Sequence, residues 1–347
     1  IFGCSGKGNR NYMETVMLDM TEAIDSVLMK RAGSILRQGG LVAFPTETVY
    51  GLGANALDEH AAARIYAAKG RPSDNPLIVH IAKTEDLETI AAEIPENARK
   101  LAKAFWPGPL TMIFRKKAIV PYGTTGGLDT VAVRMPDHPV ALALIEAGGG
   151  FIAAPSANTS GRPSPTRAAH VADDLAGAVE MIIDGGNVGI GLESTIVDLT
   201  EGEPVILRPG YINETMLEQV IGAVHMDPAL LMDDPQQRPK APGMKYRHYA
   251  PKASLTIVEG RAERVVDRIN HLVEEDLQAG RRAGVIATEE TAGCYRQGIV
   301  KAAGTRRNEI TIAARLYSIL REFDDLEVDR IYSEAFETPQ MGHAIMN

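Results

Sequence analysis

Apolar and polar positions follow two periods along the chain, and together they predict alternating strands and helices. Short apolar runs bounded by turn residues predict strands at 41–44, 77–81, 110–114, 129–134, 151–153, 181–184, 193–198 and 205–207. Apolar residues at helical spacing predict helices at 21–38, 59–69, 84–92, 95–105, 139–147 and 167–175. Thr166 is the expected N-cap of the last helix. This alternation predicts an α/β fold with mixed strand directions.

The periodicity stops between residues 226 and 252, which predicts a linker. This segment is first acidic and then reads Arg238-Pro-Lys-Ala-Pro-Gly-Met-Lys-Tyr-Arg-His-Tyr-Ala-Pro, with no apolar period. Beyond it, strands expected at 255–258, 283–287 and 330–332 alternate with helices at 262–279 and 310–323. We therefore expect a first domain at 13–225, a linker at 226–252 and a small, doubly wound, Rossmann-like α/β domain at 253–347.

Composition agrees with a two-domain globular enzyme. The chain has 347 residues, of which 45% are apolar and 23% are charged. Its net charge of −9 argues against a protein that coats nucleic acid without sequence preference. Two cysteines make neither a disulfide framework nor a metal-ligand pair, so a reducing cytoplasm is the expected location. Residues 1–12 lack the apolar core of a signal peptide, and we interpret them as a leader before Met13.

Loops that follow the predicted strands carry cations and hydroxyls. Lys69 and Arg71 stand two residues apart, on a segment that Gly70, Pro72 and Pro76 keep from being helical. The sequence contains no recognisable nucleophile elbow and no histidine spacing typical of zinc sites, so no protein-built metal site is expected. Cations with hydroxyls and no nucleophile favour phosphate chemistry by positioning and charge stabilisation. Further candidates in these loops are Thr46, Asn75, Thr130, Arg134, Ser156, Asn158, Ser164, Ser194 and Arg208.

Several of these residues also have a purely structural interpretation. Arg134 and Arg208 can be strand-end ion pairs, and His80, within an apolar strand, can be a hydrogen-bonded core histidine. The hydroxyls after the strand at 151–153 can serve turns and caps. The basic run 115–117 is a solvated strand end, with RNA contact as the alternative.

The linker is long and chemically well equipped for a passive connector. Lys245, Tyr246 and Arg247 lie between Pro242 and Pro251. A tyrosine and cations on such an arm can fold over a bound nucleotide and exclude water, whereas the simpler alternative is a tether.

Seven motifs occur in order along the first predicted domain. They begin at Phe44 (Phe-Pro-Thr-Glu-Thr-Val-Tyr-Gly-Leu-Gly), Lys69 (Lys-Gly-Arg-Pro-Ser-Asp-Asn-Pro), Trp106 (Trp-Pro-Gly-Pro-Leu-Thr), Thr130 (Thr-Val-Ala-Val-Arg-Met-Pro), Ala154 (Ala-Pro-Ser-Ala-Asn), Glu193 (Glu-Ser-Thr-Ile-Val-Asp) and Leu207 (Leu-Arg-Pro-Gly). The linker adds the motif Pro242-Gly-Met-Lys-Tyr-Arg-His-Tyr-Ala-Pro. Together they resemble the YrdC-like family, in its long two-domain form, whose members are L-threonylcarbamoyladenylate synthases. The resemblance covers residues 13–347.

The resemblance implies a YrdC-like twisted mixed sheet and a nucleotidyltransferase that uses L-threonine, bicarbonate, ATP and Mg²⁺. Threonylcarbamoyl-AMP and pyrophosphate are the implied products, and a partner transferase would pass the threonylcarbamoyl group to the tRNA adenosine beside the anticodon. The resemblance assigns to threonine Thr46, His80, Arg134 and Ser194. It assigns to ATP Lys69, Arg71, Asn75, Thr130, Ser156, Asn158, Ser164, Arg208 and Tyr246.

Some alternatives stay open at this point. Thr46 is preferred over Thr48 as the threonine contact because it directly follows Pro45. Related carbamoyl-transfer domains occur in hydrogenase maturation, but the chain lacks the zinc-finger cysteines that accompany them. A double-stranded-RNA-binding module is a third hypothesis, which the acidic composition disfavours. Because the family continues past Ala-Ile-Met-Asn347 with a basic segment, we expect a truncated C-terminal end.

Overall fold

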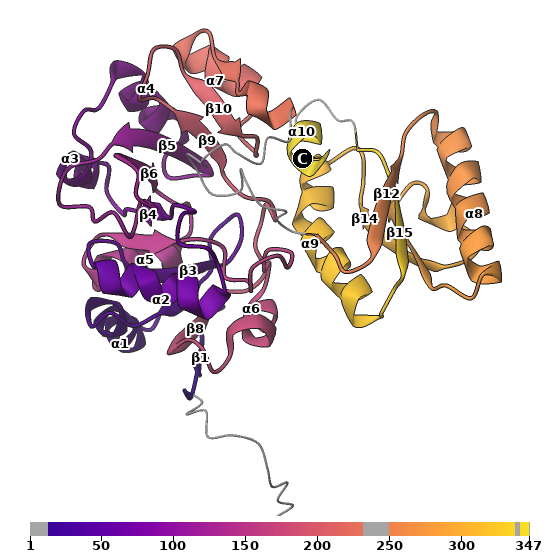
Figure 1. Ribbon diagram of the computed structural model, residues 1–347, viewed down its shortest axis with the longest axis horizontal. Helices are drawn as coiled ribbons and strands as arrows, with labels where there is room; N and C mark the ends of the chain where they lie inside the picture. The colour runs from indigo at the N-terminus through magenta and orange to yellow at the C-terminus, as the bar shows by residue number, and fades with distance from the viewer. Residues whose placement is uncertain (1–12, 232–249, 337–340, 347) are drawn as a thin grey trace, which may run out of the picture.

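The computed structural model describes residues 13–231, 250–336 and 341–346, which form two α/β units lying beside each other (Figure 1). The first unit is built on an eleven-stranded sheet and the second on a four-stranded sheet. The predicted α/β fold with a smaller second domain is confirmed. Within the described ranges, none of the helices has the length and apolar character needed to span a membrane.

The large sheet mixes parallel and antiparallel neighbours, as predicted. For example, β4 (Ile78–His80) is parallel to β6 (Thr130–Arg134), and β6 is antiparallel to β5 (Leu110–Arg115). In spatial order the strands are β1 (Val16–Asp19), β8 (Met181–Asp184), β2 (Val42–Phe44), β3 (Gly51–Asn55), β7 (Ile152–Ala154), β4, β6, β5, β9 (Thr195–Asp198), β10 (Val205–Arg208) and β11 (His225–Met226).

Around β2, both faces of this sheet are buried. Along β2 the side chains alternate, so that Ala43 belongs to one apolar cluster while Val42 and Phe44 belong to another. The helices of this unit are α1 (Ser26–Arg37), α2 (Glu59–Lys69), α3 (Leu87–Ile90), α4 (Glu96–Phe105), α5 (Pro139–Gly148), α6 (Ala168–Leu175) and α7 (Glu214–Ile221).

The second unit is a small parallel sheet with a helix on each side. Figure 1 shows α8 (Ala262–Gln278) on one face and α9 (Glu309–Asp325) on the other, with α9 turned toward the first unit. A short helix, α10 (Gly342–Met346), lies near the end of the chain. The strands, all parallel, are in order β12 (Ser254–Val258), β15 (Arg330–Glu334), β13 (Ala283–Thr288) and β14 (Ile299–Gly304).

The predicted starts of α1 and α6 are wrong, for reasons of local hydrogen bonding. Helix α1 begins at Ser26 rather than at 21, because the Asp25 carboxylate accepts the amides of Val27 and Leu28 and caps the first turn. Helix α6 begins at Ala168 with Arg167 as its N-cap. The predicted cap Thr166 instead donates its amide to Nδ1 of His170, at 3.3 Å.

Strand β3 is not among the predicted strands, and its sequence, Gly51-Leu-Gly-Ala-Asn, contains few strand formers. The glycines are required by packing rather than by a turn. A Cβ at Gly53 would lie 2.9 Å from Ile152 Cγ2 and 3.0 Å from a Phe44 ring carbon, so only glycine allows the neighbouring side chains to approach. The sequence reasoning also missed β1, β11, β14 and α7.

Helix α9 packs against two loops of the first unit, the loop that follows β2 and the loop that precedes β9. Val49 and Leu192 of the first unit belong to the same apolar cluster as Leu320 and Phe323 of α9. Gly191 has φ +83°, and a Cβ there would lie 2.5 Å from the Ala313 carbonyl oxygen. The two units therefore meet backbone to backbone.

Replacing Gly33 in α1 by alanine should destabilise the protein. An added Cβ would lie 2.7 Å from Ala147 Cβ and would press on the carbonyl of the same residue in α5. We expect the free energy of unfolding to fall by about 1–3 kcal/mol, although alanine is the better helix former. Denaturant unfolding of Gly33→Ala, of a matched control variant and of the parent measures this change.

Gly148→Ala in α5 is the matched control, because its added methyl meets chiefly Leu36 Cδ1 at 3.0 Å, the movable end of a side chain. It should change stability by less than about 1 kcal/mol. A Gly33→Ala protein as stable as the parent would contradict the close α1–α5 packing.

Candidate active site

A cleft with about 650 Å³ of empty space, counting the part open to solvent, lies where several strand ends and loops of the first unit converge. Most residues predicted for binding line it, which confirms that the loops after separate strands meet in one place. The predicted residues in the lining are Thr46, Lys69, Arg71, His80, Arg134, Ser156, Asn158, Ser194 and Arg208.

Lys69 is a buried cation held by backbone carbonyls. It is the last residue of α2, which Gly70 ends in the left-handed conformation, and it is only 3% exposed. Its Nζ donates to the carbonyls of Ser156, at 2.5 Å, and Asn158, and to Asn158 Oδ1 at 3.2 Å. Burial, with the neighbouring Arg71 guanidinium second, holds the pKa of the Lys69 ammonium well below its usual value.

Two further buried arginines face the cleft. Arg71 donates from Nη2 to the Pro76 carbonyl at 3.1 Å. Arg208, at the end of β10, donates from Nε to the Ser194 carbonyl at 3.0 Å and from Nη2 to Ser194 Oγ at 3.1 Å. Ser194 Oγ also forms a hydrogen bond with Thr111 Oγ1 at 2.7 Å, so both Arg208 and Thr111 fix its position.

Arg134 has a carboxylate partner that the sequence reasoning missed. It ends β6, is 4% exposed, and donates from Nη2 to Glu47 Oε1 at 2.6 Å and from Nη1 to Thr48 Oγ1 at 2.9 Å. The other carboxylate oxygen of Glu47 is buried and accepts no hydrogen bond from the described residues. The only signal in the sequence was the acidic residue inside the Thr-Glu-Thr loop.

Thr46 and Thr48 both line the cleft and touch each other, with their hydroxyl oxygens 2.9 Å apart. The Thr46 hydroxyl donates to the Val49 carbonyl at 2.6 Å and so belongs to the turn itself. The Thr48 hydroxyl is the one that contacts Arg134. The preference for Thr46 as the substrate contact therefore stays a prediction.

His80 lies next to Arg134 in the sheet, because β4 and β6 pair in parallel at this position. Its ring is buried, and Nδ1 lies 3.1 Å from the carbonyl oxygen of Ile78. Burial, and then the Arg134 charge, lowers the pKa of His80 to about 3. It therefore stays neutral at physiological pH and can contribute hydrogen bonds to the cleft, but not charge.

Three predicted residues do not line the cleft, and a fourth lies outside the described residues. Thr130 starts β6, at the end opposite Arg134. Asn75 and Ser164 are fully buried behind the lining. Ser164 Oγ donates to Glu193 Oε1 at 2.5 Å, and Glu193 is a lining residue that the sequence reasoning did not propose. Tyr246 and the rest of the linker arm fall in 232–249, outside the described residues.

The cleft therefore combines four buried cations with hydroxyl and backbone hydrogen-bonding groups. Lys69, Arg71, Arg134 and Arg208 are each less than 10% exposed. Such a concentration of buried positive charge, drawn from three separate segments of the chain, favours a ligand with several negative groups, because charged pairs interact strongly away from water. A polyphosphate and a carboxylate fit this description.

The chain was compared with known families and proteins. A Sua5–YciO–YrdC family model, described as telomere recombination, matches residues 34–210, and a model described as the C-terminal domain of threonylcarbamoyl-AMP synthase matches residues 212–347. A threonylcarbamoyl-AMP synthase of Bacillus subtilis is 54% identical over 319 residues, covering 91% of this chain and 90% of the relative.

Relatives from an archaeon are similar in both sequence and structure. A threonylcarbamoyl-AMP synthase of Pyrococcus abyssi is 51% identical over 333 residues, covering 96% of each chain. The crystal structure of Pyrococcus abyssi Sua5 complexed with L-threonine matches with a TM-score of 0.91 at 50% identity, again covering 96% of each chain. The similarity therefore extends over both units.

The buried His80 should make the protein less stable in acid. In the unfolded chain a histidine binds a proton below about pH 6.5, whereas in the fold His80 binds one only near pH 3. The free energy of unfolding should therefore fall as the pH is lowered from about 6.5 toward 3, with up to about 1.4 kcal/mol per pH unit from this group. Denaturant unfolding between pH 4 and 8 measures the slope.

The His80→Gln variant should show a shallower slope, and His60→Gln, at an exposed position on α2, should keep the slope of the parent. Parallel slopes for the parent and His80→Gln would contradict a histidine that is buried in its neutral form.

Proposed function

The chain belongs to the Sua5–YciO–YrdC family, in the long form with the threonylcarbamoyl-AMP synthase C-terminal domain, and we propose that it forms threonylcarbamoyl-AMP. The substrates are L-threonine, bicarbonate and ATP, and the second product is pyrophosphate. The observation that carries the proposal is the convergence of four buried cations in a cleft of the matched domain. High identity to named synthases over more than 90% of the chain supports the same reaction.

We propose that Lys69, Arg71 and Arg208 bind the triphosphate of ATP. In the structure the Lys69 ammonium donates to the carbonyls of Ser156 and Asn158 and to Asn158 Oδ1, which are all neutral acceptors. Phosphate oxygens are stronger acceptors for an ammonium than neutral carbonyls are. Nucleotide binding would therefore favour the charged form of Lys69, whose pKa burial holds down.

We assign the threonine side of the cleft to Arg134, Ser194, His80 and Thr46. The carboxylate of the amino acid would approach the Arg134 fork, where the Glu47 carboxylate lies 2.6 Å from Nη2. Glu47 therefore occupies with its own carboxylate the position proposed for the substrate, and the two must share the guanidinium or exchange. Neutral His80 would contribute a hydrogen bond only.

The reaction needs no nucleophile from the protein. The amine of threonine and bicarbonate form a carbamate with release of water, and a carbamate oxygen then attacks the α-phosphorus of ATP while pyrophosphate leaves. The protein's part is to align the two reactants and to stabilise the charge that develops on the leaving pyrophosphate. We propose that Lys69 and Arg71, which stand two residues apart in the chain and are both buried in the cleft lining, perform the second task.

We propose that Mg²⁺ enters with ATP, coordinated by phosphate oxygens, and neutralises part of the triphosphate charge. Glu193 is the acidic residue in the cleft lining, and both its oxygens already accept hydrogen bonds, from Ser164 and from Tyr317. The donors of the cleft are mostly cations and hydroxyls, which suits a metal held chiefly by its nucleotide.

Threonylcarbamoyl-AMP is a mixed anhydride, which water hydrolyses. A partner transferase that acts on tRNA must therefore bind it before it is hydrolysed. We propose a cytoplasmic location for this sequence of reactions.

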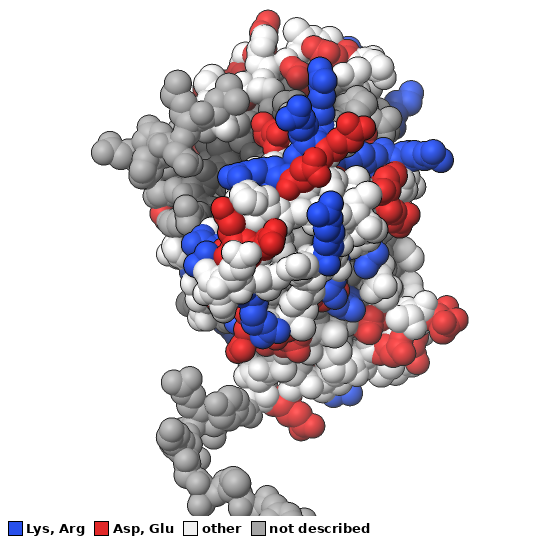
Figure 2. Space-filling model, turned by 90° about the vertical axis from the view of Figure 1, so that its right-hand side faces the viewer, with Lys and Arg blue, Asp and Glu red and all other residues white. Residues whose placement is uncertain are grey.

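Direct RNA binding has less support. Figure 2 views the molecule from the side of the second unit and shows Lys and Arg intermixed with Asp and Glu on the described part of that face. A surface that binds nucleic acid needs clustered positive charge instead.

Pyrophosphate release should require threonine and bicarbonate. Serine, which lacks one methyl group, should react more weakly by a factor that corresponds to about 1–3 kcal/mol. Alanine and leucine should release little pyrophosphate. A coupled pyrophosphate assay, with and without each amino acid, measures this. Equal turnover with leucine and threonine would refute the proposal.

Removing either cation of the phosphate wall should abolish most activity without unfolding the protein. We expect Lys69→Ala and Arg71→Ala to lower turnover by about two to four orders of magnitude, because each removes charge stabilisation from the leaving pyrophosphate. Lys83→Ala, at a position with a 62% exposed side chain, is the control and should retain activity. Near-normal turnover of a folded Lys69→Ala protein would rule out its proposed role.

A further inference from the structure

Helix α9 of the second unit forms part of the wall behind the cleft. Tyr317 and Arg321 stand one turn apart on the same face of the helix, and both reach into the first unit. The Tyr317 hydroxyl donates to Glu193 Oε2 at 2.7 Å, and Glu193 lines the cleft. Arg321, in contrast, reaches the loop that holds Lys69.

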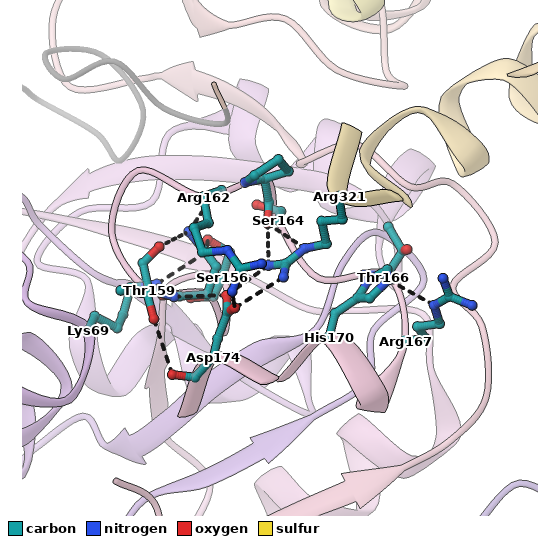
Figure 3. A network of polar contacts seen from close by, with 12 residues as sticks. Lys69, Ser156, Thr159, Arg162, Ser164, Thr166, Arg167, His170, Asp174 and Arg321 are labelled. Carbon is teal, nitrogen blue, oxygen red and sulfur yellow. Dashed lines mark hydrogen bonds and ion pairs between the residues drawn. The ribbon is translucent and has the colours of Figure 1, made fainter. Parts of the chain in front are cut away.

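Arg321 makes a buried, two-pronged contact across the interface. It is 2% exposed, and its Nη1 and Nη2 donate to the two carboxylate oxygens of Asp174 at 3.1 and 2.8 Å. Its Nε and Nη2 also donate to the carbonyl of Pro163 at 3.1 and 2.6 Å. Figure 3 shows the guanidinium of Arg321 pointing from α9 toward Asp174 and the loop at 156–164.

Asp174, which accepts from Arg321, also accepts hydrogen bonds from the loop at 156–164. Its side chain is completely buried, and it accepts the Thr159 amide at 3.1 Å and a hydrogen bond from Arg162. Asn158 in turn donates from Nδ2 to the carbonyls of Thr159 and Arg162, each at 2.9 Å. A continuous set of hydrogen bonds therefore runs from Arg321 to the loop.

The far end of this set is Lys69. The carbonyls of Ser156 and Asn158, in the same loop, are the backbone acceptors of its Nζ. The loop has little regular structure of its own, and Gly161 in it has φ +92°. Its shape therefore depends on side-chain contacts, and Arg321 supplies them at Pro163 and, through Asp174, at Thr159.

We propose that Arg321 is a positioning residue for ATP, acting through Asp174 and the loop at 156–164 on Lys69. This rests on the proposed function, in which Lys69 binds the triphosphate. Without Arg321, the Asp174 carboxylate would lose two donors and the Pro163 carbonyl would lose its arginine partner, so the loop would settle in another shape. The threonine side, built around Arg134, has no part in this set of contacts.

Steady-state kinetics of Arg321→Met test the proposal. We expect the KM for ATP to rise at least tenfold, and the Kd of ATP measured by titration calorimetry to rise with it, while the KM for threonine stays within about twofold. Arg321→Lys, which keeps the charge but cannot donate to all these acceptors at once, should fall between the parent and Arg321→Met. Asp174→Asn, which alters the other side of the contact, should produce the same split and serves if Arg321→Met does not fold.

Arg306→Met is the matched control in the second unit. Arg306 donates to the buried Glu334 at 2.7 Å, so its loss also leaves a carboxylate without its arginine, but within the second unit alone. It should lower the thermal midpoint without changing either KM. A fall in kcat alone in Arg321→Met, with both KM values and the Kd of ATP unchanged, would indicate only a smaller folded fraction and would overturn the proposal.

The same measurements separate this proposal from the proposed function. If the parent binds ATP but releases no pyrophosphate with threonine, the proposed function fails, and the ATP affinities of the Arg321 variants still decide the present question. If the parent makes threonylcarbamoyl-AMP and the Arg321 and Asp174 variants bind ATP as tightly as it does, the positioning role fails and the function stands.

Discussion

The structure depends on keeping positive charge buried at one place. Lys69, Arg71, Arg134 and Arg208 lie within a single cleft, and each would be costly there without acceptors. Neighbouring loops supply these acceptors as backbone carbonyls, hydroxyls and the carboxylate of Glu47. The shape of the loops is therefore coupled to the charge they surround, and any ligand that binds must replace or share those acceptors.

The mixed sheet makes this arrangement possible, because its strands end near one another although they are far apart in the sequence. Strands β4 and β6 run in parallel and bring His80 beside Arg134. Strand β3, antiparallel to β2, approaches closely through Gly53. The second unit adds a layer that the first does not have, since α9 contacts Glu193 and Pro163, which belong to two different loops next to the cleft.

Much of the fold, and the cations of the cleft, could be predicted because their signals are local. The bounds of α2 were predicted correctly, since Gly70 stops the helix just after Lys69. Thr130 and Arg134 stand at opposite ends of β6, and only Arg134 lines the cleft, so the ATP contact of Thr130 stays a prediction. Glu47 and Arg321 could not be identified, because what marks them is a tertiary partner: Arg134 in one case and Asp174, 147 positions away, in the other.

The backbone contact at Gly191 limits how freely the two units can be recombined. A second unit taken from a relative would have to present small residues where Ala313 and Ala314 meet Gly191, and an arginine opposite Asp174. The units therefore resemble a matched pair more than interchangeable modules. During evolution, changes on the two sides of this seam should have been accepted together rather than singly.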